Sequence, residues 1–137
     1  EVIEQLNIRR ATQFAMAAAV LDLPLDPDAL LIDAMHIPHL GIYQESIIKG
    51  DRLSQSIAAA SVIAKVMRDN IMRFYHELYP LYGFHRHKGY GTRTHLEYIK
   101  VYGPCPLHRE TFRGVKEHLH STGGMQEQKT FAFQRER

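Results

Sequence analysis

The sequence predicts an α/β fold in which two short strands are flanked by helices. Two apolar runs, residues 29–33 and 43–48, have the length and composition of strands. Two longer segments, residues 3–21 and 54–78, repeat apolar residues every three or four positions, which is the spacing of one helix face. Because strand and helix patterns occur in one chain of this size, we expect a single α/β domain.

The first half of the chain has clear boundaries between these elements. The alanine-rich helix over residues 3–21 ends at the two prolines within residues 23–28, because proline cannot continue a helix. The run Ala-Leu-Leu-Ile-Asp at residues 29–33 is typical of a buried strand in a parallel sheet covered on both faces. Residues 35–41 are predicted to be a loop, and residues 49–51 a turn after the second strand.

The second half begins with the long helix, from Ser54 to about Leu78, and Pro80 ends it. Its first turns are made of small residues, which allow a helix to approach a sheet closely. Residues 81–91 are irregular, and Thr92 or Thr94 is expected to cap a short helix that Gly103 and Pro104 end. The polar residues from about 121 onward predict a loose tail.

Composition excludes several classes of protein. The chain has 137 residues, no apolar run close to the roughly 18–20 residues of a membrane span, and no signal-peptide pattern at its start. Its single cysteine, Cys105, excludes an internal disulfide and favours a reducing, cytoplasmic setting. A net charge of +2 is too small to predict nucleic-acid binding by itself. Because the first residue is not methionine, we expect a fragment or a processed product.

Two aspartates are candidate site residues. Asp33 ends the first strand, and sites in open α/β sheets form at the carboxyl ends of strands. Asp69 lies on the small, polar stripe of the long helix together with Ser54 and Lys65. The ordinary alternatives are a turn-forming role for Asp33 and a surface ion pair between Lys65 and Asp69. For a shared two-metal site, we predict that the two carboxyl groups lie within about 8 Å of each other.

Several motifs, in this order, resemble bacterial ribonuclease HII over about residues 1–116. The first is the strand that ends at Asp33, and the second is Ile48-Lys49-Gly50-Asp51. The third is the helix Ser-Gln-Ser-Ile-Ala-Ala-Ala-Ser-Val-Ile-Ala-Lys-Val-Met-Arg-Asp at residues 54–69. The others are residues 79–84, residues 87–92, His95, Gly103-Pro104, and His-Arg-Glu-Thr-Phe at residues 108–112.

The resemblance implies a ribonuclease H-like fold, of which this chain carries the C-terminal part. Residues 1–116 would belong to the catalytic domain, and residues 117–137 would be a polar extension. The family cuts the RNA strand of RNA/DNA hybrids and cuts beside ribonucleotides embedded in DNA, a DNA-repair activity. Its acidic quartet, Asp-Glu-Asp-Asp, holds Mg²⁺ or Mn²⁺. Asp33 matches the third acid and Asp69 the fourth, whereas the Asp-Glu-x-Gly-Arg-Gly motif with the first two is absent from this sequence.

Other candidate residues would bind the substrate. Tyr90 matches the family's junction-reading tyrosine, whose ring can stack on a sugar and whose hydroxyl can test for a 2′-OH. Candidate phosphate contacts come from Lys49, Ser54, Lys65, Arg86 and Lys88. The ordinary alternatives are a packed loop tyrosine and solvated surface side chains. The resemblance implies RNA/DNA hybrid and ribonucleotide-containing DNA as partners, with no membrane and no obligate protein partner.

Three functions remain open at this point. The first is a metal-dependent endoribonuclease, and the second is a catalytically incomplete nucleic-acid-binding fragment of one, because two carboxylates alone hold Mg²⁺ weakly. Without the family's first strands, a sheet edge and an apolar helix face would be left uncovered. The third is a histidine-rich metal-binding domain, suggested by the pairs His36/His39, His85/His87 and His118/His120. Acyl transfer is not supported, because the sequence contains no Gly-x-Ser-x-Gly motif.

Overall fold

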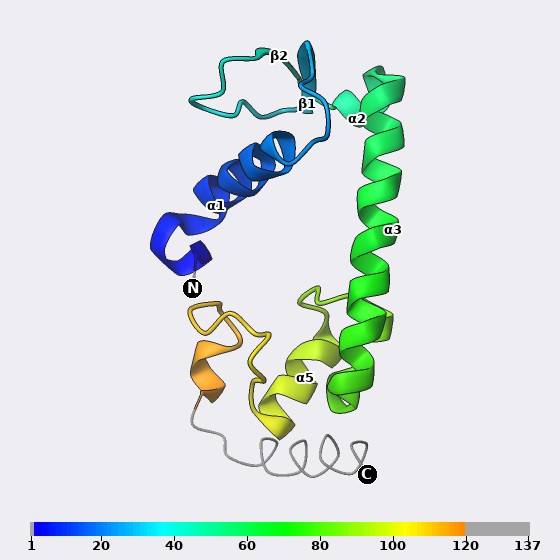
Figure 1. Cartoon of the computed structure of the whole chain (residues 1–137). Helices are drawn as coiled ribbons and strands as arrows, with labels where there is room; N and C mark the ends of the chain where they lie inside the picture. The colour runs from blue at the N-terminus through cyan, green and yellow to red at the C-terminus, as the bar shows by residue number, and fades with distance from the viewer. Residues whose placement is uncertain (1, 120–137) are drawn as a thin grey trace. The chain divides into compact units, whose positions relative to one another are not determined.

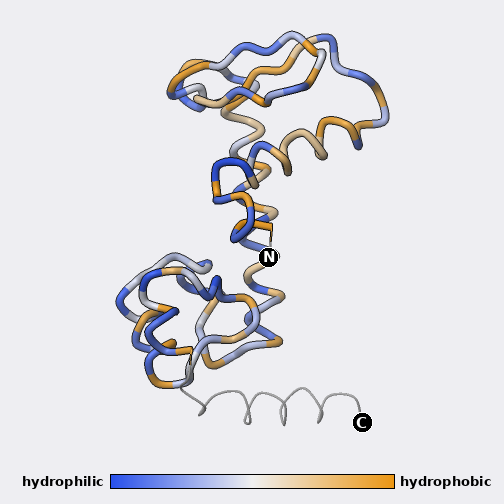
Figure 2. The backbone as a smooth tube through the Cα atoms, turned by 90° about the vertical axis from the view of Figure 1, so that its left-hand side faces the viewer, coloured by the Kyte–Doolittle hydropathy of each residue, from blue (hydrophilic) through white to orange (hydrophobic). Residues whose placement is uncertain are grey.

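The computed structural model describes residues 2–119, which form two compact units that divide between residues 64 and 65. Each unit is described by itself. The fold is mixed α/β, with one parallel pair of strands and five α-helices among the described residues. The predicted loose tail from about residue 121 lies outside the described residues. No helix among residues 2–119 has the length and apolar character of a membrane span, and Figure 2 shows hydrophobic stretches regularly interrupted by hydrophilic ones.

The first unit is built around the two predicted strands. Helix α1 (Val2–Leu21) precedes strands β1 (Ala29–Asp33) and β2 (Tyr43–Ile47), which pair in parallel so that Asp33 lies opposite Ile47. Figure 1 shows helix α2 (Gly50–Leu53) directly after the strands, followed by the long helix α3 (Gln55–Leu78). The strand and long-helix predictions are therefore confirmed to within a residue. Of the turn predicted at residues 49–51, Lys49 lies in a turn, whereas Gly50 and Asp51 already belong to α2.

The loop that joins the parallel strands, residues 34–42, is short for a crossover connection. The Gln44 side chain holds it, because its Oε1 accepts a hydrogen bond from the Ile37 N–H at 2.9 Å and its Nε2 donates to the Ile37 carbonyl at 2.8 Å. Ile37 itself is buried. The Gln13 amide also donates to the His36 carbonyl at 2.8 Å, which ties α1 to the same loop. Hydrogen bonds from α1 and from β2 thus fix the conformation of this loop.

Helix α1 is interrupted at Asn7, which the sequence analysis did not anticipate. Asn7 has φ 63° and ψ 165°, so the helix is broken at this residue. Its Oδ1 accepts hydrogen bonds from the N–H groups of Arg9 and Arg10 at 3.1 and 3.2 Å. Asparagine is a favoured N-cap residue, and here it starts the second, longer segment of α1.

The prediction that β1 is buried on both faces is wrong. Only Ile32 of this strand is buried, and Leu31 has 43% of its surface exposed. A sheet of two strands offers few neighbours to cover its faces, which is the physical reason for this exposure. Large apolar side chains are also exposed along α3, in agreement with the expected uncovered helix face: Val62, Ile63, Val66, Met67, Ile71 and Phe74.

The second unit packs the C-terminal part of α3 with shorter elements. A 3₁₀ turn (η1, Pro80–Tyr82) and a one-turn helix (α4, Phe84–His87) lead to helix α5 (Arg93–Tyr102) and a last 3₁₀ turn (η2, Lys116–His118). Of the two predicted caps, Thr92 caps α5, with its Oγ1 accepting from the His95 N–H. The buried core consists of Tyr82, Phe84, Ile99, Cys105 and Val115.

Candidate active site

Asp33 is held in place by the element that follows the strands. Its Oδ1 accepts a hydrogen bond from the backbone N–H of Gly50 at 2.8 Å, at the start of α2. A side chain at position 50 would approach Ile57 to 2.6 Å and Asp33 Oδ1 to 3.4 Å, so glycine permits this close contact. The rest of the Asp33 side chain is exposed. The strand end therefore presents an oriented carboxylate with an oxygen open to a ligand.

Lys49 and Ser54 lie on either side of α2. Lys49 is exposed and adopts a left-handed conformation (φ 58°) immediately before the helix. Ser54 separates α2 from α3, and its Oγ lies 3.4 Å from the Ile57 N–H, so its hydroxyl faces the start of α3. Lys49 and Ser54, two of the five predicted phosphate-binding residues, thus belong to the same part of the first unit as Asp33.

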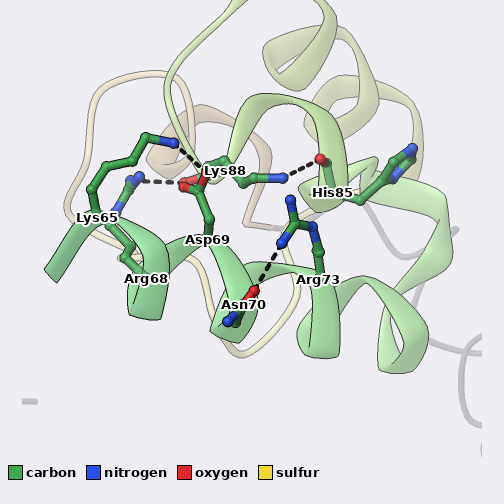
Figure 3. A network of polar contacts seen from close by, with 7 residues as sticks. All are labelled: Lys65, Arg68, Asp69, Asn70, Arg73, His85 and Lys88. Atoms are coloured by element: carbon green, nitrogen blue, oxygen red, sulfur yellow. Dashed lines mark hydrogen bonds and ion pairs between the residues drawn. The ribbon is translucent and has the colours of Figure 1, made fainter. Parts of the chain in front are cut away.

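Asp69 lies in the second unit, on α3, within a group of basic side chains (Figure 3). It forms an ion pair with Lys65 one turn earlier, which is the ordinary alternative that the sequence raised. The hydrogen bond from Lys65 holds the pKa of the Asp69 carboxyl below its usual value, with smaller contributions from the charges of Lys88 and Arg73. Asp69 is therefore ionised at neutral pH, as a metal ligand must be.

The second carboxylate oxygen of Asp69 gives an independent indication of a ligand. Its Oδ1 is buried and has no hydrogen-bond partner among residues 2–119. A buried, charged oxygen without a partner is costly unless a cation or donor satisfies it. Carboxylate oxygens are also the donors that hard cations such as Mg²⁺ and Mn²⁺ prefer. The chemistry of Asp33 and Asp69 thus fits a divalent cation.

Tyr90 is at the tip of a loop whose backbone is held on both sides. Its N–H donates to the His87 carbonyl at 2.9 Å, and its carbonyl accepts from the Thr92 N–H at 2.8 Å. Gly89, with φ +80°, makes the turn that precedes it. The Tyr90 side chain is 65% exposed. The sugar-stacking role predicted for Tyr90 requires such an accessible ring.

Arg68 is a site residue that the sequence analysis missed. Its guanidinium lies over the Tyr90 ring, with Cζ 4.4 Å from the ring centroid, and its Nη2 donates to the Lys88 carbonyl at 2.7 Å. The side chain of Lys88, by contrast, donates to the His85 carbonyl (Figure 3). Arg68 and Tyr90 are far apart in sequence, so no local spacing could have indicated their contact.

A cavity of about 470 Å³ lies next to this loop within the second unit. Its walls are mostly apolar and include Met72, Phe84 and Leu96, whereas Arg68 and Arg109 contribute positive charge. Two imidazoles, those of His95 and His108, also line it. The Tyr90 loop therefore borders a hollow with a basic rim.

The predicted site residues are divided between the two units. Asp33, Lys49 and Ser54 belong to the first, and Lys65, Asp69, Lys88 and Tyr90 to the second. The proximity of the two carboxyl groups consequently stays a prediction. Among residues 2–119, no three His, Cys, Asp or Glu side chains are arranged to hold a metal ion. That statement covers His36, His39, His85, His87 and His118, while His120 lies outside the described residues.

A comparison with families of known proteins identifies the class to which this chain belongs. The family model described as Ribonuclease HII matches residues 1–115, and many curated proteins of that name are similar to the chain. The chain belongs to the ribonuclease HII family.

Among its relatives, the ribonuclease HII of Chlamydia abortus is 54% identical over 117 residues, covering 85% of this chain and 55% of that protein. The ribonuclease HII of Lactobacillus johnsonii is 54% identical over 118 residues, covering 86% of this chain and 47% of that protein. The ribonuclease HII of Syntrophus aciditrophicus is 55% identical over 112 residues, covering 82% and 53%. The chain thus spans about half the length of the curated relatives it matches.

Proposed function

We propose that this chain contributes Asp33, Asp69 and Tyr90 to a metal-dependent endoribonuclease. The enzyme would cleave the RNA strand of RNA/DNA hybrids and cleave next to ribonucleotides embedded in duplex DNA. The observation that carries the proposal is the ionised Asp69 carboxylate, one oxygen of which is buried without a partner in the described part of the chain. Membership of the ribonuclease HII family supports it.

The two aspartates would hold Mg²⁺ or Mn²⁺ together with further acidic residues of the enzyme. Such ions, when bound, activate water and stabilise the leaving oxygen in phosphodiester hydrolysis. Asp33 brings a carboxylate that the Gly50 N–H has already oriented. Asp69 brings one that Lys65 keeps ionised, and Lys65 would move from this carboxylate toward a phosphate when a cation binds.

The Tyr90 loop would recognise the ribose. Contacts to phosphates position a duplex without reading it, so discrimination needs a group that meets the 2′-OH. The exposed Tyr90 ring satisfies this requirement, and the Arg68 guanidinium beneath it limits its orientation. Lys49, Ser54, Arg86 and Lys88 would supply phosphate contacts.

The second candidate function is nucleic-acid binding without cleavage. The ion pair between Lys65 and Asp69 favours it, because the carboxylate is already neutralised by a cationic side chain. The two functions differ in one respect: cleavage requires both carboxylates, whereas binding to phosphates does not.

The test is to replace Asp33 by Asn in an active protein that contains this chain. The amide keeps the shape and can still accept the hydrogen bond from Gly50, but it lacks the charge that a hard cation requires. We expect cleavage of an RNA/DNA hybrid in saturating Mg²⁺ to be abolished, while duplex affinity at fixed salt stays nearly unchanged. Asp28→Asn, at an exposed position just before β1, is the matched control.

Normal turnover by Asp33→Asn would contradict a ligand role for Asp33. If the unmodified protein binds the duplex but does not cleave it in Mg²⁺ or Mn²⁺, the binding function replaces the proposed nuclease. A loss of cleavage in Asp28→Asn as large as in Asp33→Asn would show that acidic residues in this region act through general electrostatics instead.

A further inference from the structure

A series of hydrogen bonds links Cys105 to Tyr90 through two histidines of the second unit. The Cys105 N–H donates to Nδ1 of His108 at 2.9 Å. The Nε2 atoms of His108 and His95 are 3.0 Å apart, and Nδ1 of His95 lies 2.9 Å from the Tyr90 carbonyl oxygen. Three successive contacts therefore connect the loop after α5 with the loop before it.

The partners determine where the protons of both rings lie. A carbonyl oxygen only accepts, so His95 carries its proton on Nδ1, and the Nε2 of the neutral ring is an acceptor. His108 must then donate from Nε2, which leaves its Nδ1 to accept from the Cys105 N–H. That Nδ1 also lies 3.2 Å from the Cys105 carbonyl, but a proton there would leave two lone pairs facing each other between the rings. The series thus has a single direction, from Cys105 to Tyr90.

We propose that His95 and His108 are positioning residues that hold the backbone at Tyr90 through this directed series, which exists only while both imidazoles are neutral. An added proton on His95 would place two N–H donors against each other at the 3.0 Å contact. His108 could accept from that proton only by moving its own proton to Nδ1, which would then face the Cys105 N–H instead of accepting from it. The directed series that holds the Tyr90 carbonyl would be broken. The pair acts on Tyr90 through the backbone and does not touch the substrate.

The surroundings of the pair favour the neutral rings. His95 is 5% exposed, and the ring of His87, on α4, stacks on it at 4.0 Å between centroids. The His108 ring packs against Tyr82 of η1 and Phe84 of α4. The other ionisable groups of this environment are the buried Cys105 thiol, the phenols of Tyr75, Tyr82 and Tyr90, and the cations Arg68, Lys88 and Arg109. None of the described residues that line the adjoining cavity is an aspartate or glutamate. An imidazolium here would have no counter-ion from that lining.

Burial accordingly lowers the pKa of both rings, to about 4 for His108. His87 adds to the same loop, because its Nε2 contacts the Tyr82 carbonyl at 2.6 Å and its Nδ1 accepts from the Gly89 N–H at 3.2 Å. At neutral pH the Tyr90 carbonyl is therefore held by the neutral His95 ring, and His87 holds the neighbouring Gly89 N–H.

The first experiment reads the protonation of the rings directly, on the full chain, by ¹⁵N NMR of the histidine side chains. At pH 7 we expect His95 in the Nδ1–H form and His108 in the Nε2–H form. Finding His95 in the Nε2–H form, or either ring charged at pH 7, would overturn the proposal. This measurement needs no variant, so a folding defect cannot obscure it.

The second experiment compares His108→Gln with His108→Leu. The glutamine amide can donate to His95 at neutral pH and can rotate to accept from a protonated His95 in acid, whereas leucine can do neither. We expect amide hydrogen exchange at Gly89, Tyr90 and Thr92 to be faster by about tenfold in His108→Leu, the size of one lost hydrogen bond. In His108→Gln the protection factor, which corrects for the intrinsic pH dependence of exchange, should stay close to the unmodified value and no longer respond to acid. His85→Gln is the control, because the His85 ring packs against His76 and is not part of this series.

Equal exchange rates in His108→Leu and in the unmodified chain would overturn the proposal, as would an unchanged acid response in His108→Gln. The functional consequence rests on the proposed role of Tyr90, so it is tested separately. We expect His108→Leu to reduce the affinity ratio for duplexes with and without one embedded ribonucleotide, at fixed salt. If Tyr90→Ala leaves that ratio unchanged, the proposed role of Tyr90 fails, and the exchange data still decide on the positioning role.

Discussion

At the scale of single residues, Tyr90 combines an exposed ring with a restrained backbone. Its N–H and carbonyl both have partners, and Arg68 restricts one face of the ring. Fixing a recognition group before the ligand arrives reduces the entropy lost on binding. A tyrosine that served only to pack the loop would instead bury its ring, and 65% of this side chain is exposed.

Replacing Tyr90 by Ala in an active protein should therefore impair recognition more than binding. We expect cleavage at a single embedded ribonucleotide to fall by roughly ten- to a hundredfold, the value of one stacking contact of about 1–3 kcal/mol. Duplex affinity, measured at one salt concentration, should change less because phosphate contacts dominate it. Tyr43→Ala, at a similarly exposed tyrosine on β2, is the control.

The prediction is contradicted if cleavage of embedded-ribonucleotide and continuous-hybrid substrates falls equally and duplex affinity falls by a similar factor. Tyr90 would then be a packing residue of its loop. Tyr43→Ala should leave both cleavage and affinity unchanged.

The sequence identified Asp33, Asp69 and Tyr90 as candidates because motifs mark them locally. It did not identify the contacts that orient them, because those contacts join residues far apart in the chain. Arg68 meets Tyr90 only because the chain reverses after α3, and His108 meets His95 only because the chain turns at Gly103. Such pairs follow from the tertiary fold, and a one-dimensional pattern does not contain them.

At the scale of elements, the junction of β1, α2 and α3 is a buried part of the first unit. Gly50, Ile57 and Ile32 are buried there, and the Gly50 N–H donates to Asp33. The same small region thus serves both the packing of the unit and the orientation of a candidate ligand. A change in packing at Gly50 should accordingly affect the Asp33 carboxylate.

Gly50→Ala should destabilise the chain by about 1–3 kcal/mol, because the added methyl group would lie 2.6 Å from the Ile57 side chain and force a shift. Gly41→Ala is the matched control, since no atom of residues 2–119 other than those of its chain neighbours lies within 4 Å of a methyl group at that position. Urea denaturation followed by circular dichroism measures both. Equal stability of the two variants would show that Ile57 relaxes without cost.

The sequence predicted the elements better than their surroundings. Strand β1 and helix α3 were found because apolar runs and Pro80 mark them, and Thr92 was one of two expected caps. The break at Asn7 was missed because the apolar spacing continues across it. The burial of β1 was overestimated because a continuous apolar run indicates an intrinsic tendency to be covered, while coverage itself depends on neighbouring elements.

At the scale of the whole molecule, the buried ionisable groups define a pH range of greatest stability. Burial lowers the pKa of His108 to about 4, so the unfolded chain binds a proton more readily than the folded one below the ordinary histidine pKa of about 6.5. Its stabilising effect is complete above that value and is lost as the pH falls toward 4. Burial raises the pKa of the Cys105 thiol to about 11, so stability also falls as the pH rises from about 9 toward 11.

We therefore expect the urea midpoint of unfolding to be highest between about pH 6.5 and 9 and to decline on both sides. His108→Gln should flatten the decline between about pH 6.5 and 4. The lowered pKa of Asp69 should contribute only at still lower pH, below its ordinary value of 3.8. A midpoint that is constant from pH 7 to 4 would contradict the neutral, buried state of His108.

The burial of Cys105 also has a practical consequence for labelling. It is the only cysteine in the sequence, it is 4% exposed, and its thiol stays protonated at neutral pH. Thiolate is the form that attacks a maleimide, so the native thiol is protected in the folded chain. A cysteine placed at Gly91, where a side chain would have none of the described residues except its chain neighbours within 4 Å, would therefore be the dominant site of dye attachment. A fluorophore beside Tyr90 and a second one on a duplex would then form a donor–acceptor pair without removal of any native residue except that glycine.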